Sequence, residues 1–212
     1  VKCETPGRAL IQSFTKSVMA GAVQTAAQAA KAPASTGGGG SELGLIPCRG
    51  IFPDWPPLDT GRKGITYPAT EVGLWYEALR WWEGLVAQLG ETVLADQVRA
   101  TAERVRAHYL ELFYDGAVGA ICDAVFPATR RPLRTYSIWA LTPLQGAFGH
   151  ELLAGREPAV AEHVLRHQVD LTFPAIRQVA TDSAYPSAYE RLHWPLWDHL
   201  AAKLMRRGNH AE

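Results

Sequence analysis

The stretch that decides the fold is Ala69-Thr-Glu-Val-Gly-Leu-Trp-Tyr-Glu-Ala-Leu-Arg-Trp-Trp-Glu-Gly-Leu-Val-Ala-Gln-Leu89. Its first apolar stripe has the three- and four-residue spacing of an α-helix and comprises Val72, Trp75, Leu79, Trp82, Val86 and Leu89. A second apolar stripe comprises Leu74, Ala78, Trp81 and Leu85. A helix that is apolar on two sides is expected to pack on two sides, so we expect an inner helix of a layered helical fold.

More helices are predicted further along the chain. A second amphipathic helix spans about 92 to 114, and the short connection to the first predicts an antiparallel pair. Residues 119 to 126 are short and apolar, which favours a strand or an extended segment. The segment from about 136 to 148 predicts a helix interrupted near Pro143.

Two final helices complete this expectation. One begins at Glu157-Pro158, where proline is well placed to start a helix, and runs to about 169. The last spans about 188 to 206 and ends in basic residues. The sequence therefore predicts an all-α fold of about six helices arranged as hairpins, with one or two strands at most.

Composition bounds the class of protein. The chain has 212 residues and is 47% hydrophobic, which suits one folded domain or two small ones. Its 21 basic and 21 acidic residues balance, which argues against a nucleic-acid partner. No apolar run approaches the roughly 20 residues that span a bilayer, so no membrane partner is expected. The three cysteines, an odd count without framework spacing, favour a reducing, cytoplasmic setting.

The N-terminal part differs in composition from the rest. Residues 8 to 31 are alanine-rich and compatible with a helix, which could pack on the domain, form an arm, or serve as a targeting or partner-binding helix. Residues 37 to 41 form a Gly-rich linker of natural or engineered type, and in the second case residues 1 to 36 would be foreign. We therefore divide the chain into 1–36, 37–41 and a helical domain over 42–212.

A stiff loop precedes the first long helix. Between Gly44 and Gly61 the chain is too rich in proline and glycine for regular structure, yet it carries Asp54, Trp55 and Asp59. Loops fixed to rigid helices are where binding and catalytic groups tend to lie. Asp54 could also simply cap its own turn, as most aspartates beside proline do.

Five segments together resemble the (α/α)6-toroid glycoside hydrolases, in particular the α-L-rhamnosidase-like and amylo-1,6-glucosidase-like families and, further off, the trehalase-like enzymes. These segments are Gly44 to Pro47, Phe52 to Pro57, Tyr67 to Leu79, Arg134 to Leu144, and Tyr189 to Pro195. The similarity covers about 44 to 207 and lies in the order and spacing of the segments.

The chain departs from the family pattern at several positions. Gly73 and Glu77 depart from the family's helix pattern Glu-hydrophobic-Asn-Ala-Leu-Trp-Tyr-Asn-Ala-Leu, and Thr135 and Tyr136 stand in place of Pro and Asn at a later helix start. The segment from Tyr189 lacks the family's glycine. A full toroid has twelve helices, about twice the number predicted here, so the resemblance implies a fragment, one piece of a split assembly, or a reduced relative.

The resemblance implies an inverting glycoside hydrolase, in which two carboxyl groups flank the scissile bond. Asp54 falls where the family has its general acid, and Trp55 would stack on a sugar and raise the pKa of that acid. Glu71 could hydrogen-bond a sugar hydroxyl or could simply complement the positive end of its helix. No base can be singled out from four further carboxyl groups, Asp123, Asp182, Glu190 and Asp198.

Other side chains are candidates for substrate binding. Arg62 and Arg134 could bind hydroxyl groups or could form surface ion pairs. Trp75 could offer a stacking platform or fill the core, and His193 and Trp194 could line the rim of a pocket.

A helical i, i+4 pair, His163 and His167, could hold a metal, but with no third ligand evident we expect two solvent-facing histidines. Neither a metal nor a cofactor is therefore predicted.

The leading interpretation is thus hydrolysis of a glycosidic bond with Asp54 as the proton donor and a carbohydrate as the substrate. The alternative is a non-catalytic helical domain that binds a glycan or a protein. In that case a partner chain, or a second copy of this one, would complete the toroid.

Overall fold

The computed structural model describes residues 65–127, 129–170, 175–184 and 195–207, together with Ser13, Leu43, Leu45, Cys48 and Arg49. Several predicted features lie outside these described residues, namely the 8–31 helix, the 37–41 linker, Asp54, Trp55, Arg62, Glu190, His193 and Trp194. No helix in the described part of the chain is both long enough and apolar enough to span a membrane.

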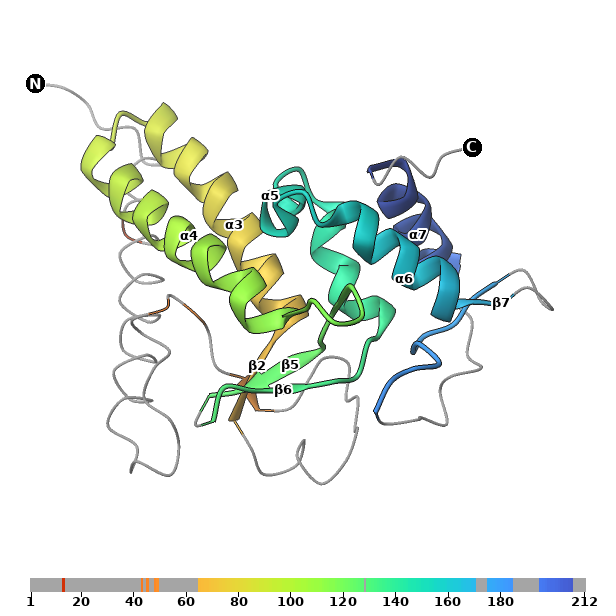
Figure 1. Cartoon of the computed structure of the whole chain (residues 1–212). Helices are drawn as coiled ribbons and strands as arrows, with labels where there is room; N and C mark the ends of the chain where they lie inside the picture. The colour runs from red at the N-terminus through yellow and green to blue at the C-terminus, as the bar shows by residue number, and fades with distance from the viewer. Residues whose placement is uncertain are drawn as a thin grey trace, which may run out of the picture.

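An antiparallel pair of long helices forms one side of the molecule (Figure 1), as the sequence predicts. Helix α3 spans Ala69–Gln88 and helix α4 spans Thr92–Phe113. Gly90 connects them with a φ of +77°, a left-handed conformation that favours glycine. The side chains buried between the helices recur at helical spacing and include Val72, Tyr76, Leu79, Val98, Ala102, Val105 and Tyr109.

Helix α3 packs on two sides, against α4 and against η2 and α5, but its second apolar stripe takes no part in that packing. Its second apolar stripe faces outward, with Leu74 44% exposed, Trp81 61% and Leu85 38%. Trp81 is held against the surface by an edge-on contact with Phe148, 5.5 Å between ring centroids, and its indole N–H donates to Glu77. The stripe through Trp81 is therefore not part of the core.

Small antiparallel sheets accompany the helices, so the all-α prediction is too simple. One sheet has the order β1 (Cys48–Arg49), β2 (Ile65–Pro68), β5 (Ala124–Phe126), β6 (Arg131–Leu133). Two further pairs join β3 (Tyr114–Asp115) to β4 (Ala120–Ile121) and β7 (Val169–Asp170) to β8 (Ala175–Ile176). Strands of two to four residues are too short to show an alternating pattern, and the fold is best described as mostly helical.

Shorter helices form the other half of the described structure (Figure 1). The segment around Pro143 is the 3-10 helix η2, Ile138–Gln145, where a helix broken at that proline is predicted. It leads into α5, Gly149–Leu153, which no sequence pattern indicates. Helix α6 spans Glu157–His167, close to its predicted bounds, and α7 spans Pro195–Arg207, with the predicted start at 188 outside the described residues.

The two departures from the family's helix pattern are packing features. A side chain at Gly73 would overlap the ring of Pro143, so glycine there lets α3 approach η2 closely. Glu77 accepts hydrogen bonds from the backbone amides of Ala147 and Phe148, at 2.7 and 2.8 Å. Both residues therefore fix α3 to the segment that runs from η2 into α5.

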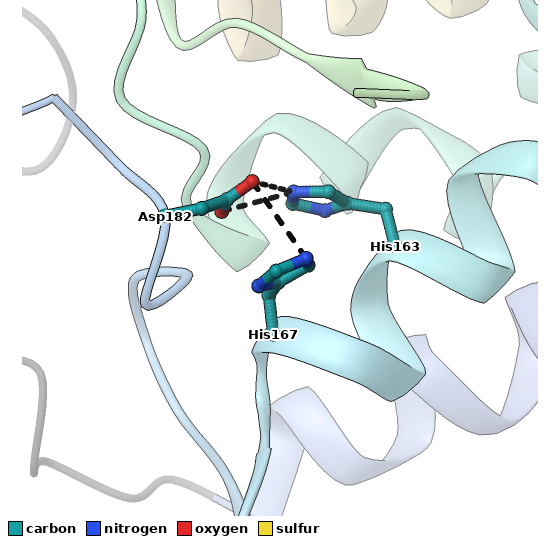
Figure 2. A group of neighbouring side chains, drawn as sticks. All are labelled: His163, His167 and Asp182. Carbon is teal, nitrogen blue, oxygen red and sulfur yellow. Dashed lines mark hydrogen bonds and ion pairs between the residues drawn. The ribbon is translucent and has the colours of Figure 1, made fainter. Parts of the chain in front are cut away.

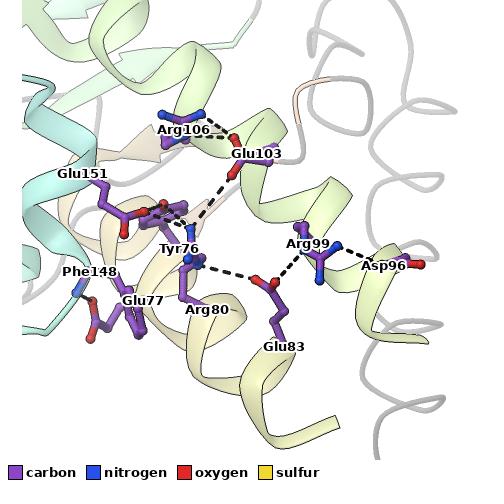
Figure 3. A network of polar contacts seen from close by, with 10 residues as sticks. All are labelled: Tyr76, Glu77, Arg80, Glu83, Asp96, Arg99, Glu103, Arg106, Phe148 and Glu151. Carbon is purple, nitrogen blue, oxygen red and sulfur yellow. Dashed lines mark hydrogen bonds and ion pairs between the residues drawn. The ribbon is translucent and has the colours of Figure 1, made fainter. Parts of the chain in front are cut away.

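A polar network joins α3 to α4 and α5 (Figure 3). The Tyr76 hydroxyl donates to the carboxylate of Glu151, which Arg80 also contacts at 2.9 Å. Arg80 in turn lies 3.4 Å from Glu83, and Glu83 pairs with Arg99 of α4 at 2.6 Å. Because each charge in this chain of contacts has an opposite neighbour, the network is suited to holding helices together rather than to binding a ligand.

Candidate functional site

Asp123 is a buried carboxyl group next to the start of α3. It lies between β4 and β5, and only 2% of the residue is exposed. Its backbone oxygen accepts the amide of Ala69, the first residue of α3, at 2.8 Å, and its own amide donates to Thr135 at 2.9 Å. The start of α3 and the backbone of Asp123 are therefore fixed relative to each other.

Ser137 orients this carboxyl group. The backbone amide of Ser137 and its hydroxyl both donate to Oδ1 of Asp123, at 3.1 and 2.6 Å. The second oxygen, Oδ2, is buried and has no hydrogen-bond donor among the described residues. Burial raises the pKa of Asp123 to about 7, the Ser137 hydrogen bonds oppose that rise, and the charge of Glu71 adds to it. Asp123 can therefore hold a proton near neutral pH.

Glu71 is the second carboxyl group of the site. It lies in the first turn of α3 and is half-buried. Its position at the positive end of the helix favours a negative charge. Burial is the main cause of the raised pKa of Asp123, and the negative charge of Glu71 adds to it.

Three tryptophans lie on α3, η2 and α7, the helices near this end of the core. Trp75 lies one turn after Glu71 on the same face of α3 and is half-buried, with an indole nitrogen that has no hydrogen-bond partner among the described residues. Thr70 donates to the backbone oxygen of Trp139 at 2.8 Å, which ties η2 to the start of α3. Trp139 and Trp197 meet edge to face with ring centroids 5.6 Å apart.

Arg134, predicted as a substrate-binding residue, has a structural partner instead. Its side chain is 61% exposed, and its Nε lies 3.0 Å from Asp115. The same carboxylate accepts a hydrogen bond from the Tyr136 hydroxyl at 2.9 Å. This is the surface ion pair that the sequence left open as the alternative. Of the predicted site residues, Glu71 and Trp75 share one face of α3, while Asp54, Trp55, Arg62, His193 and Trp194 lie outside the described residues.

Sequence reasoning did not single out Asp123 from the four candidate carboxyl groups. A signal was present, because Asp123 is the only charged residue in the run Ala120-Ile-Cys-Asp-Ala-Val-Phe126. A charge inside an apolar run indicates either a buried, hydrogen-bonded group or a functional one. Of the other candidates, Asp198 is exposed, and Asp182 contacts a histidine.

The expectation of two solvent-facing histidines is wrong for His163. Only 4% of the residue is exposed, and its Nε2 lies 3.1 Å from both carboxylate oxygens of Asp182. His167 lies beside it on α6, so the third group that the sequence did not reveal is Asp182. It is brought there by the β7–β8 pair and the turn that follows, a contact that helical spacing cannot predict.

Comparison with known proteins adds no relative: no protein-family model matches the chain, and no curated protein is significantly similar to it.

Proposed function

We propose that this chain is a carbohydrate-active domain that hydrolyses a glycosidic bond with inversion, built like part of an (α/α) toroid. The observation that supports the proposal is the carboxyl pair Glu71 and Asp123, one of which can hold a proton near neutral pH, at the start of an aromatic helix. This helix also carries one of the five segments in which the resemblance to toroid hydrolases lies.

The chemistry assigns different tasks to the carboxyl groups. Asp54 is the general acid that protonates the leaving oxygen as the glycosidic bond breaks. A water on the opposite face of the sugar attacks the anomeric carbon and gives its proton to a second carboxylate, the general base. Glu71, half-buried and favoured as an anion, accepts hydrogen bonds from sugar hydroxyls. Asp123 is too deeply buried to touch a substrate, so it acts as a positioning residue that holds the start of α3, and with it Glu71, in place.

Aromatic side chains suit such a ligand. Sugar rings present apolar C–H faces, and indole faces offer flat apolar surface beside polar groups. Trp75 follows Glu71 by one helical turn, so a ring that stacks on the indole would bring its hydroxyl groups toward the carboxylate. Trp55, in the loop before the helix, would contribute a second face.

Turnover of a panel of aryl glycosides and oligosaccharides tests this proposal. Native protein should release reducing sugar from at least one of them, and Asp54→Asn and Glu71→Gln should each lower kcat/KM by about 100-fold or more while the melting temperature is kept. Glu162→Gln is a matched control, because Glu162 is exposed on α6 and pairs only with Arg166 among the described residues. Absence of turnover on every substrate would contradict the hydrolase proposal.

A second candidate function, assembly with another chain, is favoured by the outward stripe of α3. Leu74, Trp81 and Leu85 present apolar surface along several turns of one helix. Contiguous exposed apolar surface of this kind is typical of a protein–protein contact. A second copy of this chain, or a partner helix, would cover the stripe and extend the helical layer as the toroid expectation requires.

A further inference from the structure

Three potential metal ligands meet at the end of α6. This cluster is separate from the carboxyl pair at the start of α3. They are His163, His167 and Asp182, and one ligand atom from each lies within 4.8 Å of the others (Figure 2). We infer that these three side chains form a binding site for a divalent transition-metal ion, which we assign as Zn²⁺. The inference does not depend on glycan hydrolysis.

Helix α6 and the turn after β8 position the ligands. A spacing of i, i+4 places the two imidazoles on one face of α6, with ring centroids 4.9 Å apart. The backbone amide of Thr181 donates to the backbone oxygen of His167 at 3.0 Å, which docks the Asp182 turn onto the last turn of the helix. Backbone contacts therefore bring the carboxylate to the histidines without help from a metal.

The ring nitrogens are arranged as metal ligands require. Nε2 of His163 lies 3.1 Å from each oxygen of Asp182, and Nε2 of His167 lies 3.9 Å from Oδ2. The other nitrogen of His167, Nδ1, is 3.2 Å from the Thr181 hydroxyl. Metal-bound histidines usually engage the second ring nitrogen with a neighbouring oxygen in this way, which fixes the tautomer and leaves Nε2 for the ion.

The separations suit a tetrahedral ion. With metal–ligand bonds of about 2.0–2.2 Å, ligand atoms in a tetrahedral zinc site lie about 3.4 Å apart. The nitrogen–oxygen separations of 3.1 and 3.9 Å between Asp182 and the two histidines bracket that value. Small side-chain rotations would therefore close the three ligands around one ion.

Burial differs across the site. The His163 side chain is 3% exposed and stacks edge-on against Tyr136, whereas His167 is 27% and Asp182 is 23% exposed. One side of the site is thus anchored in the core and the other faces solvent, which leaves a fourth position for water. Two imidazoles and one carboxylate favour zinc and similar ions over Mg²⁺ and Ca²⁺, which prefer oxygen ligands.

A metal-free ion pair is the competing explanation. It accounts for the 3.1 Å contact between His163 and Asp182 and for the longer 3.9 Å contact between His167 and Asp182. Arg166, the nearest cation on α6 in sequence, is engaged by Glu162 at 2.7 Å. The two explanations differ in one respect that can be measured, because only the metal site needs all three side chains at once.

Metal titration of the chelator-treated full chain tests the inference. Native protein should bind one equivalent of Zn²⁺ in competition with a colorimetric chelator, and its melting temperature should rise with Zn²⁺. Co²⁺ should give the visible absorption of a tetrahedral site. His167→Gln and Asp182→Asn should each weaken Zn²⁺ binding by at least about 100-fold, and Thr181→Val, which removes only the outer partner, by about 10-fold.

A matched control is His108→Gln. His108 lies 3.2 Å from Glu111 on the surface of α4 and forms a histidine–carboxylate pair, without a third ligand among the described residues. This variant should bind Zn²⁺ like native protein. If native protein binds no stoichiometric Zn²⁺, or if His167→Gln and Asp182→Asn bind it equally well, the inference is overturned and the cluster is an ion pair only.

Discussion

Ser137 donates two hydrogen bonds to a single oxygen of Asp123, one from its backbone amide at 3.1 Å and one from its hydroxyl at 2.6 Å. The carboxyl group is therefore fixed in one orientation, while burial and the charge of Glu71 favour its protonated form. This combination of a fixed orientation and a raised pKa is the physical basis of the proposed site.

The first prediction is that the effect of Asp123 on the free energy of unfolding depends on pH. In the unfolded chain its carboxyl loses a proton near pH 3.8, whereas in the folded chain it does so near about 7. Its contribution to the free energy of unfolding is therefore fully present below about pH 4 and is lost as the pH rises to about 7. Asp123→Asn keeps the shape but cannot ionise. Relative to native protein, the variant should gain on the order of a few kcal/mol between pH 4.5 and pH 8.

Urea unfolding of both proteins at the two pH values measures this difference. Taking the difference between variant and native protein removes the contributions of titrating groups that do not interact with Asp123. A difference that stays constant from pH 4.5 to pH 8 would show that Asp123 is ionised in the folded protein throughout.

The second prediction concerns Ser137→Ala. Loss of the hydroxyl hydrogen bond should destabilise the fold by about 1–2 kcal/mol and move the pH transition of Asp123 upward, because this hydrogen bond favours the carboxylate. Ser183→Ala is the control, since the Ser183 hydroxyl accepts the amide of Tyr136 at 3.1 Å and does not contact Asp123. If the pH transition of Asp123 is the same in Ser137→Ala and Ser183→Ala, Ser137 does not stabilise the Asp123 carboxylate.

The third prediction separates two glycines of α3. At Gly84 an added methyl group would meet nothing within 4 Å, so Gly84→Ala should stabilise the protein by about 0.5–1 kcal/mol through helix propensity. At Gly73 the same methyl would overlap Pro143, so Gly73→Ala should destabilise by about 1–3 kcal/mol. Thermal or denaturant unfolding measures both, and a stabilising Gly73→Ala would contradict the close contact of α3 with η2.

The fourth prediction concerns the outward stripe of α3. If a second copy of the chain covers it, Leu85→Glu should lower the association measured by sedimentation equilibrium at least 10-fold, the loss expected for about 1.4 kcal/mol of contact energy. Leu165→Glu is a matched control, because Leu165 on α6 is 41% exposed and Leu85 is 38% exposed. A native protein that stays monomeric at all concentrations, or equal effects of the two variants, would remove the self-association proposal.

Long periodic segments were predictable, and tertiary contacts were not. The bounds of α3, α4 and α6 follow from apolar spacing, proline and glycine, because these act within the segment itself. Periodicity alone could not show that the stripe through Trp81 faces solvent, since it marks an apolar face without identifying what covers it. Strands of two residues, such as β7 and β8, carry too few positions for any pattern.

The candidate site residues likewise fall into those that the sequence could indicate and those that only tertiary contacts reveal. Glu71 and Trp75 were predictable because both lie on one helix at a spacing that the sequence displays. Asp123 and Asp182 become informative only when β5 and the turn after β8 bring them to their partners. For Arg134 the sequence left two roles open, substrate binding and a surface ion pair. Its exposure and its pairing with Asp115 favour the ion pair.

The most direct test of the proposed function is the configuration of the first sugar released. Proton NMR during hydrolysis of the best substrate in the panel should show the anomer opposite in configuration to the bond cleaved, as an inverting pair of carboxyl groups requires. Asp54→Asn should abolish that signal at an unchanged melting temperature. Retention of configuration, or equal turnover by Asp54→Asn, would contradict the account.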